Sequence, residues 1–311
     1  MLVVDDNHDS SARIGFGERI LSAGGVTLRG DVSRAGEPVI VPEADGSDAV
    51  AFYPVPYLEP ETARHALGAP DARSHELLLR LALDRARADL ATRSSMRAVA
   101  VVHAFVTGGS ESDSELALAV GGSAEVPLKS LAGFNYTALG HLHGRQSFGD
   151  GSARYSGSLM AYSFSEHAHT KGAWLIDMPT TGEMTVAPIN YPVHRKLFQL
   201  RGSIAELLAD NTLHYAEQGY VHITATDVML PAEPMAQLRR RFPHVVHLVH
   251  EPPARATDTV SYADRVRGKS DYELSIDFFA DVAGRSVTDE EAADLLAAIE
   301  TPVSPGRERA A

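Results

Sequence analysis

Side chains suited to metal chemistry follow three apolar, strand-like runs of this sequence. After residues 2–4 come Asn7, His8 and Asp9, after residues 98–102 comes His103, and after residues 134–139 come His141 and His143. Open α/β sheets present ligands at the carboxyl ends of their strands, so we expect these side chains to meet at one edge of a sheet. Imidazole and amide oxygen are suitable ligands for a borderline divalent metal such as manganese or zinc. The pattern therefore predicts a metal-dependent phosphoesterase.

None of these motifs is specific by itself. An Asn-His-Asp tripeptide usually lies in a turn, because Asn and Asp favour turn conformations. A solitary histidine such as His103 is more often a hydrogen-bonded core residue than a ligand. His141 and His143 are a stronger signal, because two histidines at i and i+2 beyond a strand end can reach one site. The order of the three motifs and their strand context is more specific than any one of them.

The composition limits the class of protein. A chain of 311 residues is long enough for two or three domains, and 44% hydrophobic with 22% charged residues is typical of a soluble globular protein. No apolar run approaches the roughly 20 residues needed to span a bilayer. Residues 1–9 lack the features of a secretory signal, so we expect a cytoplasmic protein. With no cysteine, any metal must be bound by His, Asn, Asp or Glu.

The net charge of −13 argues against a protein that holds DNA by bulk electrostatics alone. It does not exclude a nuclease, because local arginines and bound cations can offset an acidic surface. The charge balance therefore carries little weight in either direction.

Alternating strands and helices are expected over residues 1–190. Residues 12–23 resemble a short helix, and polar loops rich in Gly and Pro extend from there to about residue 48. Leucines spaced among charged residues predict an amphipathic helix over 75–92. Apolar runs predict strands over 97–105 and 134–140, and these two strands would position the histidines.

The pattern changes after residue 190. Residues 191–253 predict a small module of alternating strands and helices, and residues 254–311 predict a polar linker followed by two short helices over 271–282 and 290–300. Thr288 and Glu291 have the spacing of a capping box at the start of the second helix.

Five further stretches, together with the metal motifs, carry a resemblance that spans nearly the whole chain. They are residues 154–158 (RYSGS), 161–166 (AYSFSE), 195–198 (RKLF), 241–244 (RFPH) and 270–274 (SDYEL). With them the chain resembles the SbcD family, the nuclease subunits of SbcCD complexes, within the calcineurin-like metallophosphoesterases. The resemblance implies an α/β calcineurin-like sandwich over 1–190, a small α+β capping domain over 191–253 and C-terminal helices for partner binding.

The resemblance also implies roles for individual residues. Asn7, His103 and His141 would coordinate one manganese ion and His143 the other. His8 would be the proton donor or transition-state stabiliser, and Asp9 would hold its ring. A pair of metal ions suits this chemistry because it neutralises the phosphate, generates hydroxide and stabilises the leaving oxygen, while an imidazole that binds no metal can protonate that oxygen.

The chain departs from the family pattern near its start. Family members have an upstream Asp-x-His and a Gly-Asp-x-x-Asp that supply two ligands of the first metal and the bridging aspartate, and these 311 residues contain no Gly-Asp-x-x-Asp. Asp6 also stands where the family has glycine. We therefore expect a sandwich truncated at its N-terminus, with three ligands of one ion but only one of the other.

The function implied is that of a nuclease subunit that hydrolyses DNA phosphodiesters in DNA repair, recombination and replication. With an SbcC-like ATPase partner, the family acts as an ATP-dependent 3′-to-5′ exonuclease and single-strand endonuclease, as a homodimer within a heterotetramer and without a membrane. Two alternatives stay open: a catalytically impaired remnant that retains only partner binding, and a stand-alone phosphoesterase for small substrates. The capping module and the terminal helices argue against the second alternative.

Other polar residues are expected to be structural. His167, His169 and Lys171 could touch DNA, but a solvated loop is the simpler interpretation. The arginines at 239–241 predict the solvated end of a helix.

Overall fold

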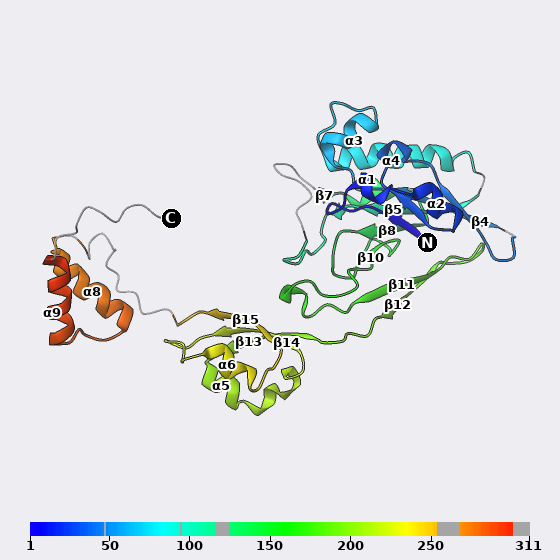
Figure 1. Ribbon diagram of the computed structural model, residues 1–311. Coiled ribbons are helices and arrows are strands. Elements are labelled where there is room, and N and C mark those ends of the chain that lie inside the picture. The colour runs from blue at the N-terminus through cyan, green and yellow to red at the C-terminus, as the bar shows by residue number, and fades with distance from the viewer. Residues whose placement is uncertain (47, 94, 116–124, 254–265, 267, 301–311) are drawn as a thin grey trace. The chain divides into compact units, whose positions relative to one another are not determined.

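The computed structural model describes residues 1–311 except 47, 94, 116–124, 254–265, 267 and 301–311 (Figure 1). The chain divides into two compact units, Met1–Pro252 and Pro253–Ala311. Most of the polar linker expected after residue 253 lies outside the described residues.

A six-stranded sheet forms the centre of the first unit. Its strands lie in the order β3 (Val39–Pro42), β4 (Ala49–Val55), β5 (Arg97–His103), β8 (Tyr136–Gly140), β10 (Ala153–Tyr155) and β9 (Gln146–Phe148). The four inner strands are parallel, and the two edge strands are antiparallel to their neighbours. Every residue of β5 except Val101 is buried, as expected for a parallel strand covered on both faces.

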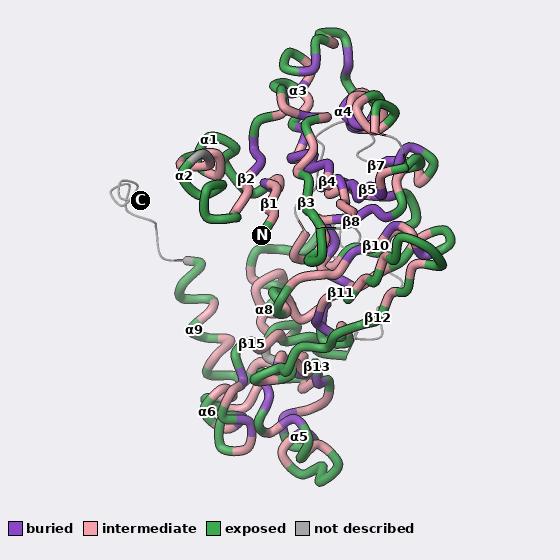
Figure 2. Tube along the Cα trace, turned by 90° about the vertical axis from the view of Figure 1, so that its right-hand side faces the viewer, coloured by how far each residue is buried: buried purple, intermediate pink, exposed green. Residues whose placement is uncertain are grey.

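Helix α4 (His75–Leu90) covers one face of this sheet. It begins at Ser74, whose hydroxyl accepts a hydrogen bond from the backbone N–H of Leu77. Its buried face includes Leu78, Leu79 and Leu83, which pack in one cluster with residues of β4 and β5, and the purple stretches of Figure 2 follow these elements. Because truncating a buried leucine to alanine costs about 2–5 kcal/mol, this contact is a major source of stability.

The N-terminal segment differs from the expected single helix followed by loops. It forms β1 (Leu2–Val4), α1 (Ser11–Ile14), α2 (Glu18–Ala23) and β2 (Thr27–Arg29). The expected helix over 12–23 is broken between α1 and α2, where Gly17 has a φ of +78° that no helix residue adopts. The region expected to be only loop contains β2, paired in parallel with β1, and the edge strand β3.

Shorter elements complete this part of the chain. They are α3 (Pro60–Ala66), the paired strands β6 (Phe105–Val106) and β7 (Glu125–Val126), the hairpin of β11 (Gly172–Asp177) and β12 (Thr185–Asn190), and 3-10 helices at Val32–Arg34, Leu128–Leu131, Phe164–Glu166 and Asn211–Ala216. Together they support a mixed α/β class, while the two-sheet sandwich that the resemblance implies stays a prediction.

The module after residue 190 is a parallel unit. Its elements are β13 (Leu197–Gly202), α5 (Ile204–Ala209), β14 (Tyr220–Ala225), α6 (Pro234–Arg239) and β15 (Val245–His250). Both strand pairs are parallel and helices alternate with strands, so the α+β label was wrong and the module is α/β. The expectation that the arginines at 239–241 are solvated also fails for Arg241. Its guanidinium donates hydrogen bonds to the carbonyls of Leu207, Leu208 and Asp210.

The second unit contains α8 (Asp271–Ala283) and α9 (Asp289–Glu300). The capping box expected at Thr288 and Glu291 is confirmed, and Ser270 and Glu273 form another at the start of α8. None of the side chains described in these two helices is buried. Across the described residues, no helix combines the length and apolar character that crossing a membrane requires.

Candidate functional site

The candidate site lies where parallel strands end. β5 ends at His103 and its neighbour β8 ends at Gly140, and these two residues are register partners. The His141-to-His143 segment therefore begins beside His103. The turn that follows β1 brings Asn7 to the same place, because its Oδ1 lies 2.9 Å from Nε2 of His103.

The expected ligands gather around one cavity. The rings of His103 and His141 lie edge to face with centroids 5.3 Å apart. A cavity of about 370 Å³ is lined by Asn7, His8, His103, His141 and His143 together with residues from the strand ends. The structure thus brings together all the residues that the strand-end argument selected as ligands, and their role in metal binding stays a prediction.

Burial keeps the two central imidazoles neutral. His103 is 8% exposed and His141 is 9% exposed. Burial, followed by the charge of His141, lowers the pKa of His103 to about 4. Burial likewise lowers the pKa of His141. A neutral imidazole is the form that binds a metal, so at neutral pH no proton has to be displaced from these ligands.

The backbone at His141 is strained and one of its ring nitrogens is orphaned. Its φ of +120° is outside the regions that residues with a side chain adopt easily, which costs about 1–3 kcal/mol. Its Nε2 is buried without a hydrogen-bond partner among the described residues, and the nearest acidic oxygen, Oε1 of Glu111, lies 3.6 Å away. An orphaned nitrogen in a neutral ring is a suitable position for a metal ligand.

His143 is supported by a buried charge network. Its Nδ1 lies 3.0 Å from Oε1 of Glu166 and 2.8 Å from Oγ of Ser114. Nζ of Lys171 donates to Glu166 and, at 2.9 Å, to the carbonyl of His143. Burial opposes ionisation of Glu166, but hydrogen bonds from Lys171, Ser114 and His143 outweigh it and lower the pKa to about 2. The network fixes the ring of His143 through Nδ1, and no hydrogen bond of the described residues involves its Nε2.

Asp5 anchors the turn that carries Asn7. It is 1% exposed, and its carboxylate accepts hydrogen bonds from Oγ of Ser11 at 2.5 Å and from the backbone N–H of Tyr57 at 3.0 Å. Burial raises the pKa of Asp5. The Tyr57 ring also meets His103 edge to face at 5.7 Å, so the same contacts fix the turn and the strand end.

His8 and Asp9 do not form the expected pair. Both are exposed, and Oδ2 of Asp9 accepts a hydrogen bond from the backbone N–H of Asp6 at 3.3 Å. Among the hydrogen bonds of the described residues, none joins Asp9 to the ring of His8. The Asp9 carboxylate therefore shapes the turn, and the His8 ring lines the cavity without its help.

The donor atoms present suit a divalent metal. Two ligands that bind one ion at about 2.1 Å and at a right angle are roughly 3.0 Å apart, and Asn7 Oδ1 and His103 Nε2 are 2.9 Å apart. The described residues contain no group of three or more His, Asp or Glu side chains that could hold a metal. The donor set of one amide and two imidazoles therefore fits an ion only if water, substrate or further protein groups complete its coordination.

Several residues at the site were not predicted. Glu166 lay within a stretch that carried the resemblance but received no role, and Lys171 was expected in a solvated loop although it is only 3% exposed. Ser114 and Glu115 hold His143 from a loop without a motif, and Oε1 of Glu115 accepts the backbone N–H of His143 at 2.6 Å. No local sequence signal distinguishes Glu166 and Lys171 from charged residues in a solvated loop.

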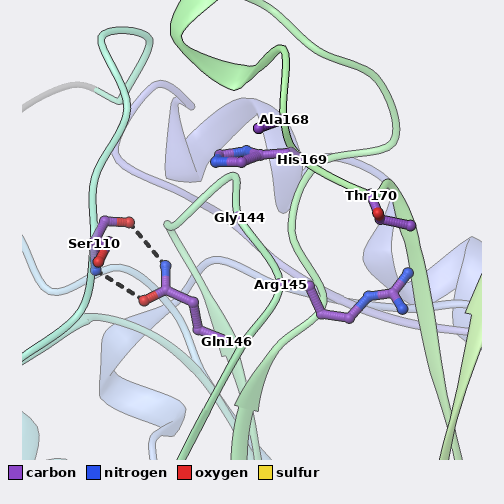
Figure 3. A pocket seen from close by; sticks show the side chains of 7 residues that line it. All are labelled: Ser110, Gly144, Arg145, Gln146, Ala168, His169 and Thr170. Carbon is purple, nitrogen blue, oxygen red and sulfur yellow. Dashed lines mark hydrogen bonds between the residues drawn. The ribbon is translucent and has the colours of Figure 1, made fainter.

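A second pocket of about 400 Å³ adjoins the His143 segment (Figure 3). His169 lies beside Gly144 on one side of it, and its Nδ1 is buried without a hydrogen-bond partner among the described residues. On the other side, the Gln146 amide exchanges two hydrogen bonds of 2.8 Å with the backbone of Ser110. The Gln146 amide of this pocket is therefore already paired with the backbone.

Comparison with known proteins gives two matches. Residues 193–283 match a family model, SbcD_C, described as the type 5 capsule protein repressor C-terminal domain. A relative from Staphylococcus epidermidis, named as the D subunit of the nuclease SbcCD, is 23% identical over 248 residues, which are 80% of this chain. The chain is SbcD-like.

The match to that relative spans 64% of the relative's own length. In this SbcD-like chain, the family model covers the parallel module and extends through α8.

Proposed function

We propose that this SbcD-like chain acts in a metal-dependent nuclease that hydrolyses DNA phosphodiester bonds. The observation that carries the proposal is the convergence of Asn7, His103 and His141 at the ends of neighbouring strands, within a chain similar to a nuclease subunit. Their order in the sequence and their burial are those expected of a preformed ligand set.

In this proposal, Asn7, His103 and His141 hold one manganese ion and His143 holds the other. Bound divalent ions would neutralise the phosphate, lower the pKa of water and stabilise the leaving oxygen. The chain's own part is to present neutral imidazoles and to exclude water from their far sides. The Glu166–Lys171 pair orients His143, and the strained backbone of His141 aims its ring.

His8 is proposed as the proton donor to the leaving oxygen. It lines the cavity, is exposed, and is bonded through its backbone N–H to Asp6 rather than through its ring. Such a ring can approach a bound phosphodiester, and an imidazole can donate a proton near neutral pH. Asp9 would act on His8 only indirectly, through the shape of the turn.

The wider biological proposal rests on similarity. The relative's name describes one component of a larger complex, and we propose an SbcC-like ATPase as the partner of this chain. ATP-dependent 3′-to-5′ exonuclease and single-strand endonuclease activity in DNA repair and recombination, with two copies in a heterotetramer, follows from the same resemblance. The exposed apolar residues of α8 and α9 suit partner binding, because Phe278 is 70% exposed and Val282 is 65% exposed.

A second candidate is a non-catalytic protein that retains partner binding. It is favoured by the lack of a Gly-Asp-x-x-Asp within these 311 residues and by the lack of a three-residue His, Asp or Glu cluster among the described ones. A phosphoesterase for small substrates is disfavoured, because it would need neither the parallel module nor α8 and α9.

The test compares the 311-residue chain with a version extended upstream to carry Asp-x-His and Gly-Asp-x-x-Asp. Both are assayed on DNA with manganese, ATP and an SbcC-like partner. We expect the extended version to cleave DNA, His8→Ala in it to abolish cleavage, and His214→Ala, an exposed control, to leave it intact. We expect the 311-residue chain to cleave negligibly, since His143 alone would hold the second ion too weakly for a pair of ions to stabilise both the attacking and the leaving oxygen.

An inactive extended version would favour the non-catalytic candidate. Robust manganese-dependent cleavage by the 311-residue chain, lost on His141→Ala, would show instead that the ligands present here suffice.

A further inference from the structure

Two histidines of the parallel module face each other at close range. His222 on β14 and His247 on β15 are register partners. Their Nδ1 atoms are 3.2 Å apart, and their ring centroids are 4.7 Å apart with the rings nearly perpendicular. Neither residue belongs to the strand-end cavity or to its proposed chemistry.

Both rings project from the face of the module's sheet that lies opposite its core. The residues beside His222, Val221 and Ile223, point into the core that α5 and α6 cover, and Leu248 packs against the same core from β15. Because side chains alternate along a strand, His222 and His247 lie on the opposite face. The strand register determines their position on this face, and packing of the core does not require histidine there.

The distance between the two nitrogens suits a shared cation. In neutral imidazoles, two Nδ1 atoms can meet at 3.2 Å only if one carries a proton between them or if an ion replaces that proton. With bonds of about 2.05 Å, this separation corresponds to an angle of about 103° at the ion, close to the tetrahedral value. Burial and the nearby His247 lower the pKa of His222, which favours the neutral form that a metal requires.

The pair also lies beside Phe164, which belongs to the segment that supports His143. The ring of Phe164 meets that of His222 edge to face at 5.4 Å, and Nε2 of Gln199, the register partner of His222 on β13, donates to the carbonyl of Phe164 at 2.6 Å. The 3-10 helix that begins at Phe164 ends at Glu166, which supports His143. The described residues supply no third His, Asp or Glu to form a group of three, so water would complete the coordination of an ion.

We propose that His222 and His247 form a two-histidine site for a late first-row divalent cation, with zinc as the first choice. Imidazole nitrogen is a preferred ligand for zinc, copper and nickel, and the pair offers no carboxylate that would favour magnesium or calcium. A bound ion would hold His222 in place against Phe164. The proposal is independent of the nuclease activity.

The experiment measures zinc bound to the full chain by equilibrium dialysis. All proteins in this experiment also carry His141→Ala, which removes a central residue of the strand-end cavity. The measurement is repeated in proteins that carry Asn7→Ala instead. We expect His222→Gln and His247→Gln each to lose one zinc ion per chain and to lose the rise in melting temperature that zinc produces. His214→Gln, at an exposed histidine of the same module, should retain both.

Unchanged zinc content and an unchanged zinc-induced shift in both variants would overturn the proposal. The two rings would then be joined by an N–H···N hydrogen bond only. Both positions face away from the core, so these variants should fold, and circular dichroism spectra of each variant without zinc will verify it.

Discussion

His103 is a buried imidazole that the fold keeps uncharged, and this has a consequence for stability. Its pKa is lowered from 6.5 to about 4 by burial and by the neighbouring His141. Between those two values the unfolded chain binds a proton that the folded chain does not, so the stability of the fold decreases as the pH falls from 6.5 to 4.

We predict that His103 contributes a pH-dependent loss of roughly 3 kcal/mol between about pH 7 and about pH 4 in the metal-free protein. His103→Gln should flatten this part of the stability curve, measured by urea unfolding at a series of pH values. A variant whose curve is as steep as that of the parent chain would contradict the neutral assignment.

The Glu166–Lys171 pair should matter for stability because both groups are buried. Glu166→Gln leaves the ammonium of Lys171 without its charged partner, and we predict a loss of about 3–5 kcal/mol in the free energy of unfolding. Glu251→Gln is the matched control, since its partner Arg201 is 61% exposed and such pairs contribute less than about 1 kcal/mol.

Acid unfolding separates the Glu166 contribution from that of His103. The stability from Glu166 is present above its ordinary pKa of 4.5 and is lost as the pH falls toward 2. Equal losses for Glu166→Gln and Glu251→Gln would show that the buried network does not stabilise the site.

At the residue scale, the sequence predicted which side chains meet at the strand ends better than it predicted the residues that support them. Asn7, His103 and His141 could be found because each follows an apolar run. Lys171 could not, because nothing local distinguishes a lysine that points into a buried network from one in water. Its burial arises when the chain brings Ser158, Glu166 and the carbonyl of His143 around its ammonium.

At the scale of elements, the segment after β10 fixes the position of His143. Gly157 has a φ of +81°, and a Cβ there would lie 2.6 Å from the carbonyl oxygen of His143. Gly157→Ala must therefore move the backbone that carries His143.

We predict that Gly157→Ala destabilises the protein by about 1–3 kcal/mol more than Gly68→Ala, as expected for overpacking. Gly68 has a similar φ of +72° but nothing within 4 Å of its Cβ, so the comparison isolates the clash from the backbone strain. Thermal unfolding of the two variants measures it, and equal destabilisation would mean that the contact with His143 is unimportant.

Elements with long periodic patterns were predicted well, and short ones were not. Helix α4 and strand β5 have apolar positions that repeat over two or more turns or along a whole strand. Strands β2, β3 and β9 have only three or four residues and depend on a neighbouring strand for their hydrogen bonds. The glycines between α1 and α2 broke a helix that the surrounding pattern suggested.

At the scale of the whole molecule, the two helices of the second unit leave apolar side chains exposed that their own packing does not bury. Besides Phe278 and Val282, Leu296 is 41% exposed and Ile299 is 40% exposed. Apolar stripes on short helices are expected to be covered by another protein.

We predict that removal of residues 271–311 abolishes co-purification with an SbcC-like ATPase and leaves the folding of residues 1–252 unchanged. A pull-down with the full-length chain as reference measures the association, and circular dichroism measures the folding. Undiminished association would assign partner binding to the first unit.

The most direct test of the central claim is a manganese titration monitored by electron paramagnetic resonance. The signal of free manganese disappears when the ion binds to the protein. We predict that the chain binds manganese and that Asn7→Ala and His141→Ala each weaken binding by at least about tenfold. His169→Ala, in the neighbouring pocket, should bind as the parent chain does. Equal manganese affinity in all four proteins would contradict the assignment of Asn7, His103 and His141 as a metal site.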